Sequence, residues 1–275
     1  MKLTSTCAAR VARLQSGDAS TFLVNTDEVP ADTKTTTIQS WFQPAYWQRK
    51  NAVIGTSHGR NTVYFVMSNT RHWVLRHYYR GGLPGKLWND QFLYLGEARS
   101  RSFAEFQLLQ QMRELGLPVP KPIAANLQRH GLYYRADLLI ERIVNSQDLF
   151  KALQHAELGD QTWQRIGFTI AAFHRHHVFH SDLNCHNILL QAQDQSEQVY
   201  LIDFDRCRIR PTGTWQQQNL QRLQRSLLKE RKTIHDEQGN AFYYHDSNWQ
   251  MLLQGYRDGM SAQETVRTSA TTGNE

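Results

Sequence analysis

Residues 178–190 read Val-Phe-His-Ser-Asp-Leu-Asn-Cys-His-Asn-Ile-Leu-Leu, and residues 199–205 read Val-Tyr-Leu-Ile-Asp-Phe-Asp. The first stretch places two polar side chains, Asp182 and Asn187, just before an apolar run. The second stretch is an apolar strand that ends at a carboxylate, Asp203. Carboxylate and carbonyl oxygens are the ligands that hard cations such as Mg²⁺ prefer. The two stretches together indicate a chemical site, and the rest of the chain is interpreted around them.

The order of residues in the first stretch, H-x-D-L-x-x-x-N-I-L, is that of a kinase catalytic loop. In such a loop the aspartate orients the attacking hydroxyl group, the asparagine binds magnesium, and a second acid reaches another face of the metal. We assign these roles to Asp182, Asn187 and Asp203, and predict a phosphotransfer centre that uses ATP and Mg²⁺. The alternative is that His180, Asp182 and Asn187 are turn and cap residues, since such side chains favour loops through local hydrogen bonds.

Composition places few limits on the fold but excludes some classes of protein. With 275 residues, 40% of them hydrophobic, the chain can bury the core of one large domain or of two lobes. No apolar run approaches the length of a membrane span, and the basic start lacks a signal-peptide core, so we expect a cytoplasmic location. Three cysteines without metal-type pairing indicate reduced thiols and argue against zinc.

Positive charge is concentrated in residues 206–232, which hold eight Lys or Arg and one acidic residue, Glu230. Such a basic block attracts phosphate on a nucleic acid, an acidic lipid or an anionic sugar. Within it, leucines at helical spacing predict a buried face that leaves Arg222, Arg225 and Lys229 available as contacts to an anionic membrane surface. The alternative is a solvated helix face.

The N-terminal part lacks periodicity until residue 53. Residues 1–44 are expected to form a loosely ordered leader with a possible short strand at 21–24. From Val53 to Met67 two strand-like runs flank a turn that we expect to hold Gly55, Ser57 and Gly59. Backbone amides at such a tip can approach the phosphates of ATP. A purely structural hairpin turn is the commoner interpretation of two glycines.

Two candidates compete for the cation that would bind the ATP phosphates. Arg76 occupies the position on a strand-like run, residues 72–79, where a kinase places its lysine, and we favour it. Lys86 is the competitor, although the Gly and Pro around it indicate a loop. A helix over 102–116 would carry Glu105 in its first turn, where the acidic partner of this cation belongs.

Beyond this helix, prolines 118, 120 and 122 enforce an extended passage into a strand over 138–143. We expect an inter-lobe hinge here, in which the backbone of Glu141 to Ile143 contacts an adenine ring. The periodicity then becomes helical. Helices are expected over 148–154, 161–176, 215–232 and 249–256.

These elements predict an α+β, protein-kinase-like bilobed fold. It would have a small β-rich N-lobe with one main helix and a larger, mostly helical C-lobe. The expected boundaries are a leader over 1–44, the N-lobe over 45–143, the C-lobe over 144–260 and a frayed tail over 261–275.

The stretches 55–60, 75–83, 103–106, 115–120, 180–189 and 201–206 together carry a specific resemblance. Over roughly residues 45–255 the chain resembles the 3-deoxy-D-manno-octulosonic acid (Kdo) kinases of Gram-negative bacteria, relatives of the lipopolysaccharide core heptose kinases. The resemblance implies transfer of the ATP γ-phosphoryl group to the 4-hydroxyl of a Kdo sugar on a lipid A precursor, Kdo-lipid IVA. It also implies a peripheral enzyme on the cytoplasmic face of the inner membrane.

Departures from protein kinases favour a substrate that is not a protein. Asp205 stands where D-F-G has glycine, Asn184 stands where the catalytic loop has lysine, and no A-P-E follows. The remaining alternatives are a heptose kinase of the inner core and a small-molecule or protein kinase of the same fold. A nucleic-acid-binding protein would use the basic block for phosphates, but the chain lacks a recognised reader motif, so no nucleic acid is expected.

Overall fold

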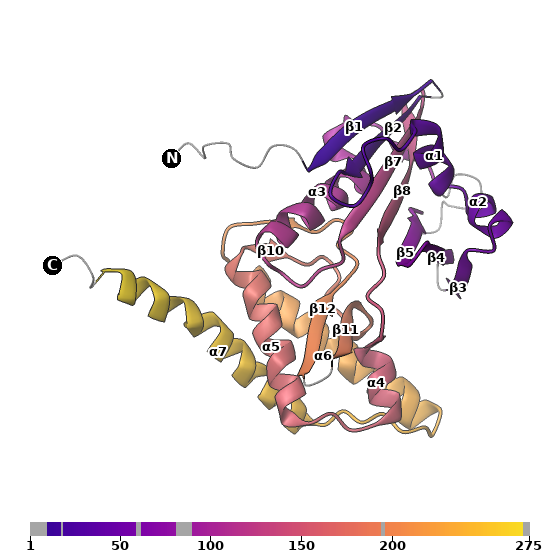
Figure 1. The fold of residues 1–275 in the computed structure, drawn as a ribbon. Coiled ribbons are helices and arrows are strands. Elements are labelled where there is room, and N and C mark those ends of the chain that lie inside the picture. The colour runs from indigo at the N-terminus through magenta and orange to yellow at the C-terminus, as the bar shows by residue number, and fades with distance from the viewer. Residues whose placement is uncertain (1–9, 18, 59–61, 81–89, 194–195, 272–275) are drawn as a thin grey trace. The chain divides into compact units, whose positions relative to one another are not determined.

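The chain folds into two compact units in a computed structural model that describes residues 10–17, 19–58, 62–80, 90–193 and 196–271 (Figure 1). The small unit comprises residues 1–111 and 120–143, and the large unit comprises residues 112–119 and 144–275. Within the described ranges, no helix combines the length and apolar character needed to cross a bilayer. The expected kinase-like α+β architecture, with a β-rich N-terminal part and a helical C-terminal part, is confirmed.

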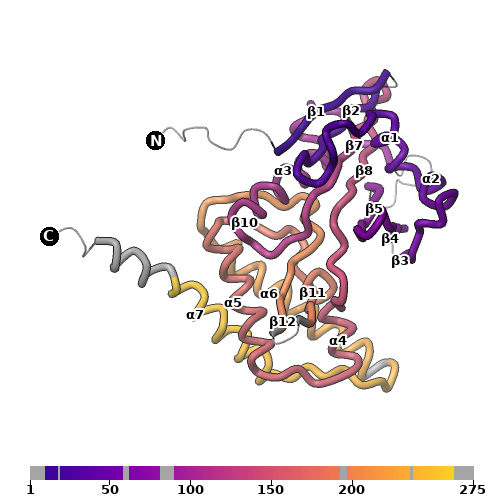
Figure 2. The backbone as a smooth tube through the Cα atoms, in the orientation of Figure 1, coloured from indigo at the N-terminus to yellow at the C-terminus, as the bar shows by residue number. Residues whose placement is uncertain are grey.

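The small unit is built on an antiparallel sheet in the order β1-β2-β7-β8-β5-β4-β3, with β6 paired to β8. The backbone trace shows β1, β2, β7 and β8 side by side (Figure 2). The strands are β1 Val11–Ser16, β2 Ser20–Asn25, β3 Val53–His58, β4 Thr62–Ser68, β5 Arg71–His77, β6 Phe92–Leu93, β7 Pro122–His130 and β8 Tyr133–Glu141.

The expectation of a loosely ordered leader over 1–44 is wrong for its described part. The possible strand at 21–24 lies within β2, which is buried along its length and pairs with both β1 and β7. Two helices follow it, α1 (Thr35–Trp41) and α2 (Pro44–Arg49). The apolar run of β2 is short. Its pairing partner β7 lies about one hundred residues further along the chain, and Phe22 of β2 stacks on Phe42 with ring centroids 5.8 Å apart, so periodicity within the strand could not reveal its burial.

Tryptophans fix α1 and α2 to the sheet. The ring centroid of Trp73, on β5, lies 5.4 Å from that of Trp41 and 6.0 Å from that of Trp47. The indole N–H of Trp47 donates to the carbonyl oxygen of Trp41 at 2.7 Å, which satisfies the polar group of a buried ring. Aromatic packing therefore holds the N-terminal helices in the same core as the sheet.

The main helix of the small unit begins where the sequence predicts it. Helix α3 (Arg101–Glu114) follows a 3₁₀ turn, η1 (Glu97–Arg99). Gly116 ends it with φ of 73°, a left-handed conformation that suits glycine at a helix C-terminus. The amide of Leu117 then donates to the carbonyl oxygen of Met112 at 2.9 Å and completes the cap.

The large unit is mostly helical. Its helices are α4 Leu149–His155, α5 Asp160–Arg175, α6 Trp215–Arg231 and α7 Asp246–Thr271, with a 3₁₀ turn η2 at Cys185–Asn187 and a π-helical turn η3 at Lys232–Glu237. Its strands form one sheet in the order β12-β11-β9 and one β10-β13 pair. They are β9 Ser146–Asp148, β10 Val178–Phe179, β11 Ile188–Gln193, β12 Ser196–Leu201 and β13 Arg208–Ile209.

The last helix departs from expectation. Helix α7 continues to Thr271, past residue 261, where we expected a frayed tail. It lies along α5, and glycines make the close approach possible (Figure 1). A Cβ atom on Gly167 would lie 1.9 Å from the carbonyl oxygen of Leu252, and one on Gly255 would lie 1.9 Å from that of Gln164. The two backbones are therefore too close for any side chain at these positions.

Replacement of Gly255 by alanine tests this helix contact. Because the new Cβ would overlap the Gln164 carbonyl oxygen, α7 would have to move away from α5, and we expect the free energy of unfolding to fall by about 1–3 kcal/mol. Urea unfolding followed by tryptophan fluorescence measures the change. Gly213→Ala is the control, since its Cβ would lie 3.5 Å from the Trp215 side chain, an ordinary contact. Equal midpoints for the two variants would contradict the close approach.

Candidate active site

The loop that carries Asp182 is anchored by the buried side chain of His180. Its Nδ1 accepts a hydrogen bond from the amide of Asp182 at 3.2 Å, and its Nε2–H donates to the carbonyl oxygen of Ile202 at 3.0 Å. Burial lowers the pKa of His180, which agrees with a neutral ring that accepts through one nitrogen and donates through the other. The ring thus ties the loop to the end of β12.

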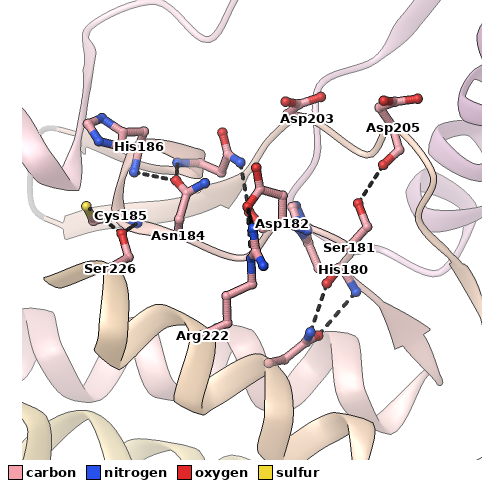
Figure 3. A network of polar contacts seen from close by, with 12 residues as sticks. His180, Ser181, Asp182, Asn184, Cys185, His186, Asp203, Asp205, Arg222 and Ser226 are labelled. Carbon is pink, nitrogen blue, oxygen red and sulfur yellow. Dashed lines mark hydrogen bonds and ion pairs between the residues drawn. The ribbon is translucent and has the colours of Figure 1, made fainter. Parts of the chain in front are cut away.

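Asp182 lies half exposed and forms an ion pair with Arg222 of α6 (Figure 3). The Nε and Nη2 atoms of Arg222 both donate to Oδ1 of Asp182, with Nε at 2.9 Å. Burial acts to raise the pKa of the Asp182 carboxyl, but the hydrogen bonds and the charge of Arg222 outweigh it, and the pKa lies below its ordinary value. The carboxylate is therefore ionised at neutral pH, as a proton acceptor must be.

The structure brings Asn187 and Asp203 to adjoining segments. The Nδ2 of Asn187 donates to the carbonyl oxygen of Asp182 at 2.9 Å, and the amide of Ile202 donates to the carbonyl oxygen of Asn187 at 3.0 Å. Asp203 follows directly, with φ of 64°, a left-handed conformation that aspartate tolerates better than most residues. The carboxylates of Asp203 and Asp205 lie on the side of the loop away from α6 (Figure 3).

This donor set suits Mg²⁺. Because the amide nitrogen of Asn187 is bonded to the loop backbone, its Oδ1 is the atom left to act as a ligand, and Asp203 adds a carboxylate. Both are oxygen donors of the kind that Mg²⁺ prefers. The chemistry of the donors therefore fits the metal that the sequence predicts.

In the small unit, the cation favoured from the sequence meets its expected partner. Arg76, on β5, forms an ion pair with the buried carboxylate of Glu105, on α3. The hydroxyl of Tyr78 donates to the same carboxylate at 2.6 Å and lies 3.0 Å from Nη2 of Arg76. Burial and the charge of Glu105 raise the pKa of Tyr78 well above its ordinary value, so it remains a donor. Lys86, the competitor, lies outside the described residues.

The glycine-bearing hairpin is present, but the turn is not where we expected it. Gly55 and Ser57 lie within β3, and Gly59 lies outside the described residues. Gly55 sits beside a register shift in the pairing of β3 with β4, and a Cβ there would approach the Phe65 side chain to 3.3 Å. A side chain at this position would crowd Phe65, and the approach of Gly55 to a phosphate stays a prediction.

Glu141 ends β8 and Ile143 is the last residue of the small unit. The amide of Glu141 donates to the carbonyl oxygen of Lys121 at 2.8 Å, so any contact between the Glu141 backbone and a base would use its carbonyl oxygen. The predicted role of these residues in adenine binding is not tested by this geometry.

Three side chains of α6 that face the catalytic loop were missed by sequence reasoning. They are Asn219, Arg222 and Ser226. Arg222 was expected to contact a membrane; the structure pairs it with Asp182 and leaves its side chain half exposed, so the membrane contact stays a prediction. The available signal was the spacing i, i+3, i+7, which places three polar residues on one helix face beside the leucines.

The fold and the loop geometry define a class, the phosphotransferases of protein-kinase-like fold. Comparison with known proteins narrows the class: the profile of the "Lipopolysaccharide kinase (Kdo/WaaP) family" matches residues 44–256, and the chain belongs to that family.

Curated relatives match most of the chain. A 3-deoxy-D-manno-octulosonic acid kinase of Vibrio vulnificus (strain YJ016) is 48% identical over 215 residues, which cover 78% of this chain and 87% of the relative. The protein of the same name from Mannheimia succiniciproducens is 44% identical over 224 residues, covering 80% and 91%. That of Haemophilus influenzae (strain PittEE) is 44% identical over 223 residues, covering 78% and 89%.

Among solved structures, WaaP in complex with acyl carrier protein superimposes with a TM-score of 0.52 at 12% identity. The match covers 86% of this chain and 93% of that one. At this identity the likeness shows the fold alone.

Removal of the Glu105 carboxylate tests the buried cluster in the small unit. Glu105→Ala would leave Arg76 without its buried counter-ion, so we expect the free energy of unfolding to fall by about 3–5 kcal/mol in urea titrations. Glu114→Ala, at the exposed end of the same helix, is the matched control and should change stability by less than about 0.5 kcal/mol. A Glu105 variant as stable as this control would contradict the ion pair.

Proposed function

We propose that this chain is a Kdo kinase that transfers the γ-phosphoryl group of ATP to the 4-hydroxyl of a Kdo residue on a lipid A precursor. The observation that carries the proposal is the 44–48% identity, over most of the chain, to proteins named 3-deoxy-D-manno-octulosonic acid kinase. The acceptor position and the lipid anchor follow from the family resemblance of the catalytic segments.

Asp182 is the group that acts on the acceptor. Its carboxylate accepts the proton of the sugar hydroxyl as the hydroxyl oxygen forms a bond to the γ-phosphorus. The bond from the γ-phosphorus to the β–γ bridging oxygen breaks, and ADP leaves with that electron pair. The role fits a carboxylate that is half exposed, and so within reach of a substrate, and ionised at neutral pH.

Asn187 and Asp203 would hold Mg²⁺, which when bound neutralises charge on the phosphates. The chain contributes the orientation of these two ligands, through the bond from Asn187 to the Asp182 carbonyl and the pairing of Ile188 with Leu201. In the small unit, Arg76 would contact ATP phosphates. Its guanidinium is positioned for this by Glu105 and Tyr78.

Two substitutions separate the roles of the acids. Asp182→Ala should abolish transfer, with a loss of about 10²–10⁴-fold in kcat, while Mg-ATP still binds, because Asp182 acts on the hydroxyl. In Asp203→Asn the new asparagine can still adopt the positive φ of this position, but the carboxylate charge is lost. The affinity for Mg-ATP should therefore fall at least about tenfold, which corresponds to about 1.4 kcal/mol. Mass spectrometry of Kdo-bearing lipid A precursor measures transfer, and calorimetry measures binding.

Asp160→Asn is the control for these variants, since Asp160 is exposed in the first turn of α5. Turnover by Asp182→Ala at the parent rate would contradict the role of Asp182, and unchanged Mg-ATP binding by Asp203→Asn would contradict the role of Asp203.

A heptose-bearing acceptor and a soluble hydroxyl compound are tested in the same assay as the Kdo lipid. If the parent protein phosphorylates one of these and not the Kdo lipid, the proposed acceptor is wrong although the phosphotransferase class stands.

We further propose that the enzyme associates peripherally with an anionic membrane surface, on the cytoplasmic face of the inner membrane. Such a surface attracts basic side chains by about 1 kcal/mol per Lys or Arg. Arg225 and Lys229 of α6 are exposed, and both belong to the basic block over 206–232. Arg222 is left out of this surface because of its ion pair with Asp182.

The double variant Arg225→Gln/Lys229→Gln tests the membrane surface. Its affinity for phosphatidylethanolamine vesicles that contain phosphatidylglycerol should fall by about 2 kcal/mol, and salt should weaken binding of the parent because exposed charges are screened. Vesicle flotation at low and high salt is the measurement. Lys34→Gln/Arg49→Gln, which removes the same charges from exposed positions of the small unit, is the control. Equal flotation of both double variants would contradict the membrane surface and would favour the alternative that the basic block is a solvated helix face.

A further inference from the structure

The catalytic loop itself carries no cation beside Asp182. The position two residues after Asp182, where kinases have lysine, holds Asn184. Its Oδ1 caps the η2 turn by accepting from the amides of His186 at 2.9 Å and Asn187 at 3.2 Å. The Asn184 side chain also hydrogen-bonds to the Asp182 carboxylate, but it is neutral, so it does not supply the positive charge of the lysine.

Helix α6 brings a cation to the same place from outside the loop. Arg222 reaches Oδ1 of Asp182 through both Nε and Nη2 (Figure 3). Because both bonds end on Oδ1, the second carboxylate oxygen, Oδ2, carries neither of them. Two donors on one oxygen hold that oxygen in place more firmly than a single donor can.

The neighbouring turns of α6 hold this arginine in register with the loop. One turn before it, Asn219 donates from Nδ2 to the His180 carbonyl oxygen at 2.8 Å and accepts from the His180 amide at 3.2 Å. One turn after it, the Ser226 hydroxyl accepts from the amide of Cys185 at 3.3 Å. Arg222 therefore lies between the contacts that Asn219 and Ser226 make with the loop. Its ion pair with Asp182 is part of one continuous interface between α6 and the loop.

We propose that Arg222 is a positioning residue of the phosphoryl transfer, which orients and neutralises the Asp182 carboxylate from α6 in place of a catalytic-loop lysine. The inference rests on the proposed phosphotransfer function. In the step, Oδ2 of Asp182 takes the proton of the acceptor hydroxyl while the hydroxyl oxygen bonds to the γ-phosphorus and ADP departs. Arg222 remains on Oδ1 and exchanges no atom.

The experiment compares Arg222→Ala and Arg222→Lys with the parent in one transfer assay. Arg222→Ala should lower kcat by about 10²-fold, the scale of a catalytic group displaced by about 1 Å, with the KM for ATP unchanged. Arg222→Lys keeps the charge but loses the two-point contact, so its kcat should be intermediate. Ethylguanidinium added to Arg222→Ala should restore part of the lost rate. Arg257→Gln is the control, since it removes an exposed arginine whose Nη2 donates to Gln254 of the same helix.

A double-mutant comparison separates positioning from a general structural role. If Arg222 acts through Asp182, then Arg222→Ala should cause no further loss in an Asp182→Ala background, where the residual rate is already that of a protein lacking the carboxylate. Full additivity of the two losses, a parent-like kcat for Arg222→Ala, or a faster Arg222→Ala would each overturn the inference. So would a loss of rate that follows weakened Mg-ATP binding and is not rescued by ethylguanidinium.

Failure of the inference and failure of the proposed function give different results. No transfer by the parent protein to Kdo-bearing lipid overturns the proposed acceptor, whichever variant is used. Transfer by the parent together with an unaffected Arg222→Ala overturns the positioning role alone. If Arg222→Ala does not fold, Arg222→Gln and Arg222→Lys carry the same comparison, since both retain a long side chain on the surface of α6.

Discussion

The position of Asp182, the proposed catalytic aspartate, depends on the hydrogen bonds of one buried residue, His180. Its two ring nitrogens bond to the Asp182 amide and the Ile202 carbonyl, and its own amide and carbonyl both bond to Asn219. A buried polar group left without a partner costs about 1–3 kcal/mol, so each of these contacts resists displacement. These contacts therefore hold the loop, the end of β12 and helix α6 in one arrangement. They also fix the positions of the side chains on these segments.

A second buried polar cluster explains an arginine where a kinase has lysine. Burial of the Glu105 carboxylate is tolerable only with charge and hydrogen-bond partners. Arg76 and Tyr78 both supply them: Nη2 of Arg76 donates to the carboxylate and to the tyrosine hydroxyl, and the hydroxyl donates to the carboxylate. A lysine ammonium is a point charge without the planar fork of a guanidinium. The tyrosine therefore gives the arginine a second hydrogen-bond partner beside the buried carboxylate.

Sequence reasoning succeeded where the determining interactions are local. Helices α3, α5 and α6 follow from apolar spacing and end signals within a few turns, and the family follows from the order of polar residues in the segment around Asp182. It failed where burial is supplied from far along the chain. Strand β2 pairs with β7 and packs against Phe42, and Gly55 lies within β3 beside Phe65 rather than in a turn. The pairing of Arg222 with Asp182 spans forty residues and depends on how α6 packs, which no local pattern encodes.

Helix α6 shows that the net charge of a segment does not reveal the role of each charged residue in it. Its leucines at 220, 223 and 227 are buried, and a neighbouring row formed by Asn219, Arg222 and Ser226 meets the catalytic loop. Arg225 and Lys229 belong to neither set of contacts and remain exposed. The helical periodicity thus places the residues of this basic segment on three faces. One face is buried, one contacts the loop, and one is exposed to solvent or available to a membrane. Arg222 lies in line with two residues that contact the loop and is itself bonded to Asp182, so part of its charge is used within the protein, whereas Arg225 and Lys229 have no such contact to the loop in the described part of the chain.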